Sequence, residues 1–173
     1  MKLKKGFGLI EMLVVIAVIG ILASIVLVNA SNVKEKAKIV QAKATAKQIY
    51  NAIVILENDT GFWPGHKQPY EIEPGASGNE ICDDLPPNDC EFKFSDPEAG
   101  LAATDGGYPD WKGPYVLSSQ LTDPWGSEYF FDTDYDIEAG AGQKWAVVIG
   151  SYGPNGQGLN QYDSDDIIYI IKE

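Results

Sequence analysis

The sequence predicts an α+β fold in which one long amino-terminal helix packs on a small antiparallel sheet. Residues 7–56 contain no proline and only two glycines, Gly8 and Gly20, and they show helical hydrophobic periodicity without a turn signal. Short β-rich segments bounded by Gly, Asn or Asp follow in the last third of the chain. A helix with one apolar stripe can bury that stripe against such a sheet, which gives an α+β arrangement.

The first half of the helix, residues 7–30, is apolar throughout apart from Glu11. It is longer than the ~20 residues that span a bilayer, so we expect a transmembrane segment or one that lies in a packed helical bundle. Residues 1–6 form a short basic leader whose three lysines favour the cytoplasm and leave the rest of the chain outside. The alternative is a secretory signal cleaved at Val28-Asn29-Ala30. Against it, the apolar run is longer than a usual signal, contains an acid and continues into an amphipathic helix.

The second half of the helix, residues 31–58, is amphipathic, and its main apolar stripe should carry a soluble domain. The helix should end at Asn58 to Gly61, because Gly61 suits a left-handed cap and Pro64 prevents continuation. A second line of small apolar residues fits either contact with another helix or ordinary core. The main stripe consists of Ile39, Ala42, Ala46, Ile49, Ile53 and Leu56, and the second line of Val33, Ala37, Val40 and Ala44.

Charge is divided unevenly along the 173 residues, whose net charge is −12. Residues 1–56 hold eight of the 13 lysines and two of the 25 acids, so the remaining part, one domain of about 110 residues, is strongly acidic. The chain contains no arginine. An acidic head without arginine argues against nucleic-acid binding through that head.

Residues 59–112 are rich in Gly, Pro and acids, and we expect a variable acidic loop region with a short helix at residues 97–103. Cys82 and Cys90 lie in this region, separated by a turn-forming Pro-Pro pair. Outside the cytoplasm they should form a disulfide. Metal ligation is the alternative, although His66 is the only histidine and there is no third thiol.

Residues 113–173 should form the sheet and a cation-binding loop, with strands at residues 128–131, 144–149 and 167–171. The loop between the last two strands gathers oxygen donors among glycines, as a site for a hard cation such as calcium would. The alternative is a solvated acidic turn. A second acidic run, residues 132–136, imitates the opening of an EF-hand but has Ile137 and Gln143 where glycine and a bidentate acid are needed, so a solvated hairpin is expected. The donors of the loop are Asn155, Asn160, Asp163, Asp165 and Asp166.

The sequence does not predict an enzyme. With His66 as the only histidine, no set of nucleophile, base and orienting group can be proposed, and no glycine-rich phosphate loop occurs.

Two stretches carry a family resemblance. The run KGFGLIEML at residues 5–13 resembles the start of type IV pilins and pseudopilins, with Gly8 in place of the usual threonine. DPWGSEY at residues 123–129 and SYGPNGQGLNQYDSDDI at residues 151–167 resemble the carboxyl-terminal half of the major pseudopilin of type II secretion. The resemblance implies a type IV pilin-like fold, cleavage by a prepilin peptidase after Gly6, and N-methylation of Phe7.

The resemblance also implies a role for Glu11. A carboxylate in an apolar span costs a few kcal/mol unless it finds a partner or reaches the headgroup boundary. After cleavage, the amino group of Phe7 in a neighbouring subunit would supply a positive charge for it. The same family places calcium in the loop before the last strand, which by position makes Asn155, Asp165 and Asp166 ligands, with Asp163 as a further candidate.

The resemblance implies a structural subunit that is stored as a single-pass protein in the lipid of a bacterial inner membrane, with its head outside the cytoplasm. Inner-membrane assembly machinery would then polymerise it into a homo-oligomeric helical filament, either an extracellular type IV pilus or a periplasmic secretion pseudopilus. The alternative is a monomeric, membrane-tethered binding module whose acidic, disulfide-closed loop recognises a ligand. Filament assembly with Glu11→Ala separates the two, because a tether should tolerate that substitution.

Overall fold

The computed structural model describes residues 8–82, 90, 92–138, 143–157 and 164–173, without the side chains of residues 25–31. Contacts divide the chain into two units, Met1–Lys38 and Ile39–Glu173. The elements described are the helix α1 (Leu9–Thr60), the strands β1 (Phe130–Asp136), β2 (Trp145–Ser151) and β3 (Ile167–Lys172), and the short 3₁₀ helices η1 (Pro64–His66), η2 (Pro69–Glu71), η3 (Pro97–Ala99), η4 (Ser118–Gln120) and η5 (Gly153–Asn155).

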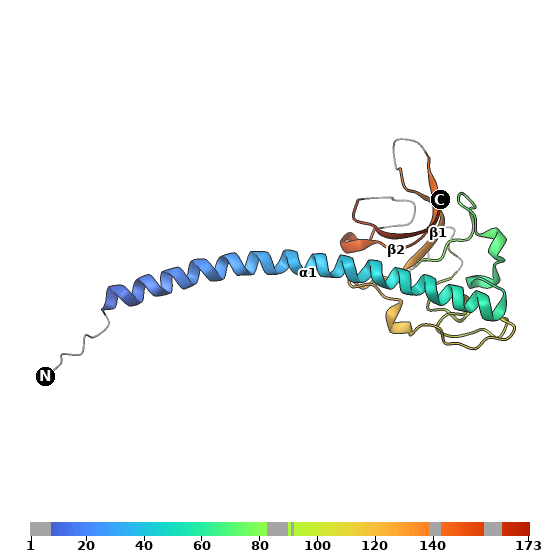
Figure 1. Cartoon of the computed structure of the whole chain (residues 1–173), viewed down its shortest axis with the longest axis horizontal. Coiled ribbons are helices and arrows are strands. Elements are labelled where there is room, and N and C mark those ends of the chain that lie inside the picture. The colour runs from blue at the N-terminus through green and yellow to red at the C-terminus, as the bar shows by residue number, and fades with distance from the viewer. Residues whose placement is uncertain (1–7, 83–89, 91, 139–142, 158–163) are drawn as a thin grey trace. The chain divides into compact units, whose positions relative to one another are not determined.

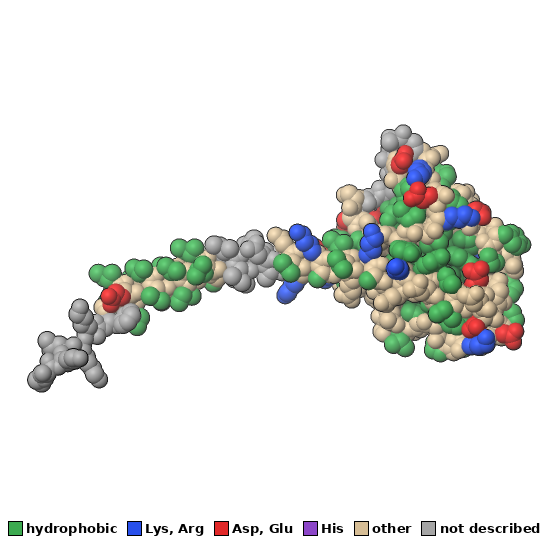
Figure 2. Space-filling view, in the orientation of Figure 1, with side chains coloured by type: hydrophobic (Ala, Val, Ile, Leu, Met, Phe, Trp, Pro, Cys, Tyr) green, Lys and Arg blue, Asp and Glu red, His purple; other side chains and the backbone are tan. Residues whose placement is uncertain are grey.

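In the first unit, the described part of α1 exposes apolar side chains all round, and Figure 2 shows them along its length. Exposed fractions reach 84% at Leu9 and 78% at Ile10. A helix that is apolar on every side needs a surrounding apolar phase or packed neighbours. Within the residues whose side chains are described, no helical stretch is both long and apolar enough to cross a membrane. The span expected at residues 7–30 includes Phe7 and the side chains of residues 25–30, which lie outside this description.

In the second unit, α1 buries one stripe against the rest of the unit, and it ends at Thr60 as predicted. The Thr60 hydroxyl donates to the Leu56 carbonyl at 2.8 Å, and Gly61 follows with φ +80°, which favours glycine. Five of the six predicted stripe residues are buried. Ile39 is the exception, with 41% of its surface exposed, because burial of the stripe begins one turn later, at Ala42.

The three strands form one antiparallel sheet in the order β1-β2-β3 (Figure 1). The predicted strands β2 and β3 are confirmed to within two residues at each end. The prediction for β1 was wrong, because the strand starts two residues later and runs through residues 132–136, which were expected to form a solvated hairpin. A register shift between Asp132 and Tyr135 lets β1 accommodate these polar residues while it stays paired with β2.

Successive side chains of a strand point to opposite faces of the sheet, and here both faces carry apolar side chains. Val147 and Ile149 of β2 pack in the cluster that includes the α1 stripe, and Ala146 and Val148 pack in a second, smaller cluster. The second cluster contains Cys82, and Cys90 packs against it. The predicted Cys82–Cys90 disulfide is confirmed, with the two Cα atoms 5.8 Å apart. The disulfide therefore fastens the loop region onto the outer side of the sheet.

The loop region carries η1 to η3, and the helix predicted at residues 97–103 is only the single turn η3. Two contacts tie Lys112 and Tyr115, at and just after the end of this region, to Asp59 in the last turn of α1. Lys112 Nζ lies 2.8 Å from Asp59 Oδ1, and the Tyr115 hydroxyl donates to Asp59 Oδ2 at 3.1 Å. The single histidine, His66, places Nε2 2.9 Å from Asp105 Oδ2 and stacks on Tyr108 with ring centroids 4.0 Å apart.

Gly150 of β2 offers a direct test of the packing on the sheet face that carries the second cluster. A Cβ at this position would lie 2.4 Å from the Phe130 ring, which covers the glycine. Gly150→Ala should therefore lower the free energy of unfolding by about 1–3 kcal/mol through overpacking. Chemical denaturation measures the change. The double variant Gly150→Ala with Phe130→Leu should lose less stability than the sum of the two single variants, whereas additive losses would contradict the steric explanation.

Candidate functional site

The amino-terminal end of α1 gives Glu11 a partner within its own chain. The backbone N–H of Gly8 donates to Glu11 Oε2 at 2.8 Å, and the N–H groups of Glu11 and Met12 donate to the Gly8 carbonyl. This is half of a capping box, with Gly8 as the cap and Glu11 three residues later. The spacing was visible in the sequence, but the interpretation of Glu11 considered only a neighbouring subunit or the headgroup region. The processing pair, Gly6 and Phe7, lies outside the described residues.

The structure brings together two of the four predicted calcium ligands, Asn155 and Asp165. Asn155 donates to Asp165 twice, from Nδ2 to Oδ1 at 2.7 Å and from its backbone N–H to Oδ2 at 3.2 Å. Asn155 Oδ1 accepts from the backbone N–H of Gln157 at 2.6 Å. Carboxylate and amide oxygens are ligands that calcium takes, and a cation between these two side chains would replace the hydrogen bond between the Asn155 amide and the Asp165 carboxylate.

The other two predicted ligands, Asp166 and Asp163, are not brought to Asn155 by any described contact. The Asp166 carboxylate accepts a hydrogen bond from the Tyr135 hydroxyl of β1 at 2.8 Å, which anchors it to the sheet. Asp163 lies outside the described residues. Gly153 fixes the approach of the two ends of the loop, because a Cβ there would lie 2.2 Å from the Asp165 carbonyl oxygen. The backbone carbonyl of Asp165 is thus held beside η5, within the same loop as its carboxylate.

A buried carboxylate that was not predicted from the sequence supports this loop. Asp123, with 6% of its surface exposed, accepts from the backbone N–H groups of Trp125, Gly126 and Ser127 at 2.8–3.0 Å. Its second oxygen accepts from the Ser151 hydroxyl, and that hydroxyl in turn accepts from the Gly153 N–H at 3.1 Å. An Asp-Pro-x-Gly pattern is typical of a turn, but the link from Asp123 to the start of the 151–166 loop comes only from the fold.

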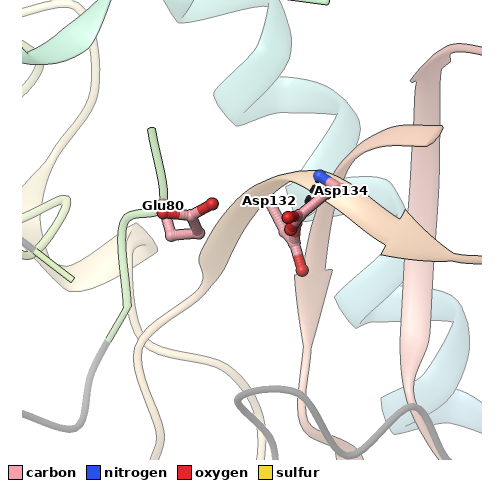
Figure 3. Close-up of side chains that lie close together, drawn as sticks. All are labelled: Glu80, Asp132 and Asp134. Atoms are coloured by element: carbon pink, nitrogen blue, oxygen red, sulfur yellow. Dashed lines mark hydrogen bonds between the residues drawn. The ribbon is translucent and has the colours of Figure 1, made fainter. Parts of the chain in front are cut away.

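A second set of carboxylates joins Glu80, two residues before Cys82, to two aspartates of β1. Oxygens of Glu80, Asp132 and Asp134 all fall within 4.8 Å of one another, and Figure 3 shows Glu80 facing the two aspartates of β1. Glu80 and Asp132 are buried. The Gly78 N–H donates to Glu80 Oε1 at 3.0 Å, and the Asp134 N–H donates to Asp132 Oδ1 at 2.7 Å. Three carboxylates at this separation can hold a metal ion.

The buried position changes the acidity of Asp132. Burial, together with a side-chain hydrogen bond with Asp134 and repulsion from the Asp134 and Glu80 charges, raises the pKa of Asp132 to about 8. Near neutral pH without a cation, the cluster therefore retains a proton. A cation that bound the three carboxylates would displace that proton.

This proton makes the stability of the head depend on pH. The unfolded chain releases the Asp132 proton near pH 4, whereas the folded chain holds it to about pH 8, so its stabilising contribution is complete below pH 4 and is lost as the pH rises to 8. In the presence of a chelator, the free energy of unfolding should fall across this range. Asp132→Asn should remove most of this pH dependence. At pH 8 its free energy of unfolding should exceed that of the parent by about 1–3 kcal/mol. The exposed control Asp110→Asn should leave the profile unchanged, and a parent whose stability rises from pH 5 to 8 would contradict the assignment.

Comparisons with known proteins match the start of the chain to a family motif and most of its length to a secretion-system protein. Residues 1–27 match the family model described as "Prokaryotic N-terminal methylation motif". Over 154 residues the chain is 28% identical to the type II secretion system core protein G of Escherichia coli, covering 89% of this chain and 84% of that protein. No solved structure matches the chain.

Two pilus proteins match shorter parts. The type IV major pilin protein PilA of Myxococcus xanthus is 32% identical over 89 residues, 44% of this chain and 40% of the relative. A probable minor fimbrial protein of Dichelobacter nodosus is 32% identical over 106 residues, 61% of each chain. These relatives are named as secretion-system or pilus components, not by an enzymatic activity. With the methylation motif at the start of an exposed apolar helix and with these relatives, the chain is similar to type IV pilins and pseudopilins.

Proposed function

We propose that this protein is a structural subunit of a type IV filament, either a type IV pilus or a type II secretion pseudopilus, that polymerises through the amino-terminal half of α1. The observation that carries the proposal is the all-round exposure of apolar side chains on α1 between Leu9 and Leu22. The methylation motif over residues 1–27 and the pilin and secretion-system relatives support it.

Before assembly, residues 7–30 lie in the inner membrane with the head outside the cytoplasm, and a prepilin peptidase removes residues 1–6. Burying each exposed Leu, Ile or Val side chain away from water is worth about 1.5–3 kcal/mol. Lipid already supplies this free energy to the stored subunit. Transfer from lipid into a filament must therefore be driven by close packing and by polar pairing between helices, with the inner-membrane assembly machinery acting on the subunit.

Polar pairing is the role of Glu11 in this proposal. In the uncleaved chain its carboxylate accepts from the Gly8 N–H. Cleavage before Phe7 creates an amino group one residue from that position, and a neighbouring subunit's amino group is the partner that neutralises Glu11 when water and headgroups are excluded. The pairing also sets the axial register of one helix against the next.

The processing step predicts a defined mature terminus. Mass spectrometry of the membrane fraction should find a chain that begins at Phe7 and carries one added methyl group on its amino terminus. Retention of Met1, or a terminus at Ser31 from signal-peptide cleavage, would refute the assignment.

Substitutions at Glu11 separate the pairing role from the helix cap. Glu11→Ala and Glu11→Gln should each reduce sheared filament yield at least tenfold, equivalent to about 1.4 kcal/mol or more, while the membrane level of the subunit stays near that of the parent. Gln retains a side-chain acceptor for the cap but not the charge. Assembly with Gln but not Ala would assign Glu11 to capping alone, and assembly with both would favour a membrane-tethered monomer. Glu35→Ala, at the other acid of the helix before Glu57, is the matched control.

We also propose that calcium binds the head through the loop of residues 151–166, with Asn155, Asp165, Asp166 and Asp163 as ligands and the Asp165 carbonyl available beside them. Bridging Asn155 and Asp165 would tie η5 to the start of β3, and Asp166 already joins that point to β1. The carboxylates Glu80, Asp132 and Asp134 are the competing location.

Thermal melting of residues 31–173 in calcium and in chelator tests the proposal. At a hundredfold excess over Kd, binding to the folded form alone adds about 2.7 kcal/mol, which should raise the melting temperature by several degrees. Asp165→Ala should abolish the increase, and Asp132→Asn should preserve it. The reverse pattern would move the ion to the Glu80 cluster, and an unchanged parent melting temperature would remove the calcium site.

A further inference from the structure

The side of α1 opposite the buried stripe has no partner among the described residues of the second unit. We define this outer face by residues that share that side at helical spacing: Val40, Lys43, Ala44, Lys47, Asn51 and Ile55. Val40 is 70% exposed and Ile55 51% exposed. The line through Val40 and Ala44, which fitted either core or another helix, is therefore not core in this chain.

The two lysines of the outer face differ from those of the head. Lys112, Lys144 and Lys172 each form an ion pair, with Asp59, Glu173 and Glu73. Among the described residues, neither Lys43 nor Lys47 forms an ion pair. The outer face therefore combines exposed apolar side chains with lysines that have no ion-pair partner among the described residues.

An acidic surface lies near the other end of the same helix segment. We define it by three exposed acids, one in η3 and two in the segment that follows it: Glu98, Asp105 and Asp110. Asp105 is ionised at neutral pH, since the Gly107 N–H and the contact with His66 hold its pKa below the usual range. Tyr108 joins this surface to the segment after α1, because its hydroxyl donates to the Glu98 carbonyl at 2.7 Å and accepts from the His66 N–H at 3.2 Å.

The two surfaces are offset along the helix. Lys43 and Lys47 precede the end of α1 at Thr60 by 17 and 13 residues, which corresponds to about 20–25 Å at ~1.5 Å per residue. One copy cannot satisfy both surfaces itself, but a parallel second copy displaced along the axis by about that distance can. Such a contact joins different patches on the two copies, so it repeats without closing and generates a filament.

We propose that the outer face of α1 docks against the acidic surface of a second copy of this chain, with Lys43 and Lys47 facing Glu98, Asp105 and Asp110. This inference rests on the proposed filament and names the contact that fixes the axial offset of its heads. Charge selects the second copy over an anionic membrane, because the same unit carries most of the chain's acids and would be repelled by anionic headgroups. Val40, Ala44 and Ile55 supply apolar area around the charged contact. Figure 2 shows lysine side chains along the helix and acidic side chains on the head.

Charge reversal in the full chain tests this contact. Lys43→Glu with Lys47→Glu, and separately Glu98→Lys with Asp110→Lys, should each reduce sheared filament yield at least tenfold. None of the four side chains forms a hydrogen bond or ion pair with the described residues, so the melting temperature of each variant should stay within a few degrees of the parent. Combining all four substitutions should restore yield to within about threefold of the parent.

The control is Lys43→Glu and Lys47→Glu combined with Glu138→Lys, an exposed acid near Lys144, which should not restore assembly. Unchanged yield in either double variant, or no recovery in the fourfold variant, would overturn the proposed contact. Loss of membrane retention in the Lys43 and Lys47 variant, with assembly otherwise normal, would assign the face to lipid and also overturn it. These outcomes are distinct from failure of the proposed function, in which the parent itself forms no filaments.

Discussion

The packing of one helical stripe against one face of a three-stranded sheet is the interaction on which the remaining structure depends. Ala42, Ala46 and Ile49 are fully buried where α1 meets the core that includes Val147 and Ile149 of β2. Within this cluster the small alanines of α1 and the branched side chains of α1 and β2 pack together away from water. Because β1 and β3 pair only with β2 among the described strands, loosening this contact removes support from the whole sheet.

The same helix leaves its other surfaces available for intermolecular contact. Leu9 to Leu22 expose apolar side chains on every side, and the outer face between Val40 and Ile55 is mixed apolar and basic. An isolated subunit can satisfy the first surface with lipid but has no described partner for the second. Stability of the monomer and assembly of the filament thus depend on different sides of one element, which lets substitutions on the outer face change assembly without unfolding the head.

Local sequence patterns were sufficient where burial follows periodicity. Five of the six stripe residues, the end of α1, two of the three strands and the Cys82–Cys90 disulfide were predicted. The course of β1 was not, because an acidic run such as residues 132–136 is buried only when distant chain covers it. Here Ile81 bridges to Phe131, and the Gly75 N–H donates to the Thr133 carbonyl.

The candidate sites show the same division. The 151–166 loop was recognised from its oxygen donors, and the structure joins Asn155 to Asp165 within it. The support from Asp123 and the approach of Glu80 to Asp132 arise from contacts across 28 and about 50 residues of sequence, which no local pattern encodes. Glu11 is different, because its contact with Gly8 is three residues away and follows a known capping pattern.

Amide hydrogen exchange of the full chain in detergent tests most directly whether the stripe holds the head together. If it does, the most protected amides of Ile39–Thr60 in α1 and of β2 should open with one shared free energy, and Ile49→Ala should lower that value in both elements by the same amount, about 2–5 kcal/mol. Strands that keep their protection while the helix loses its own would contradict the account.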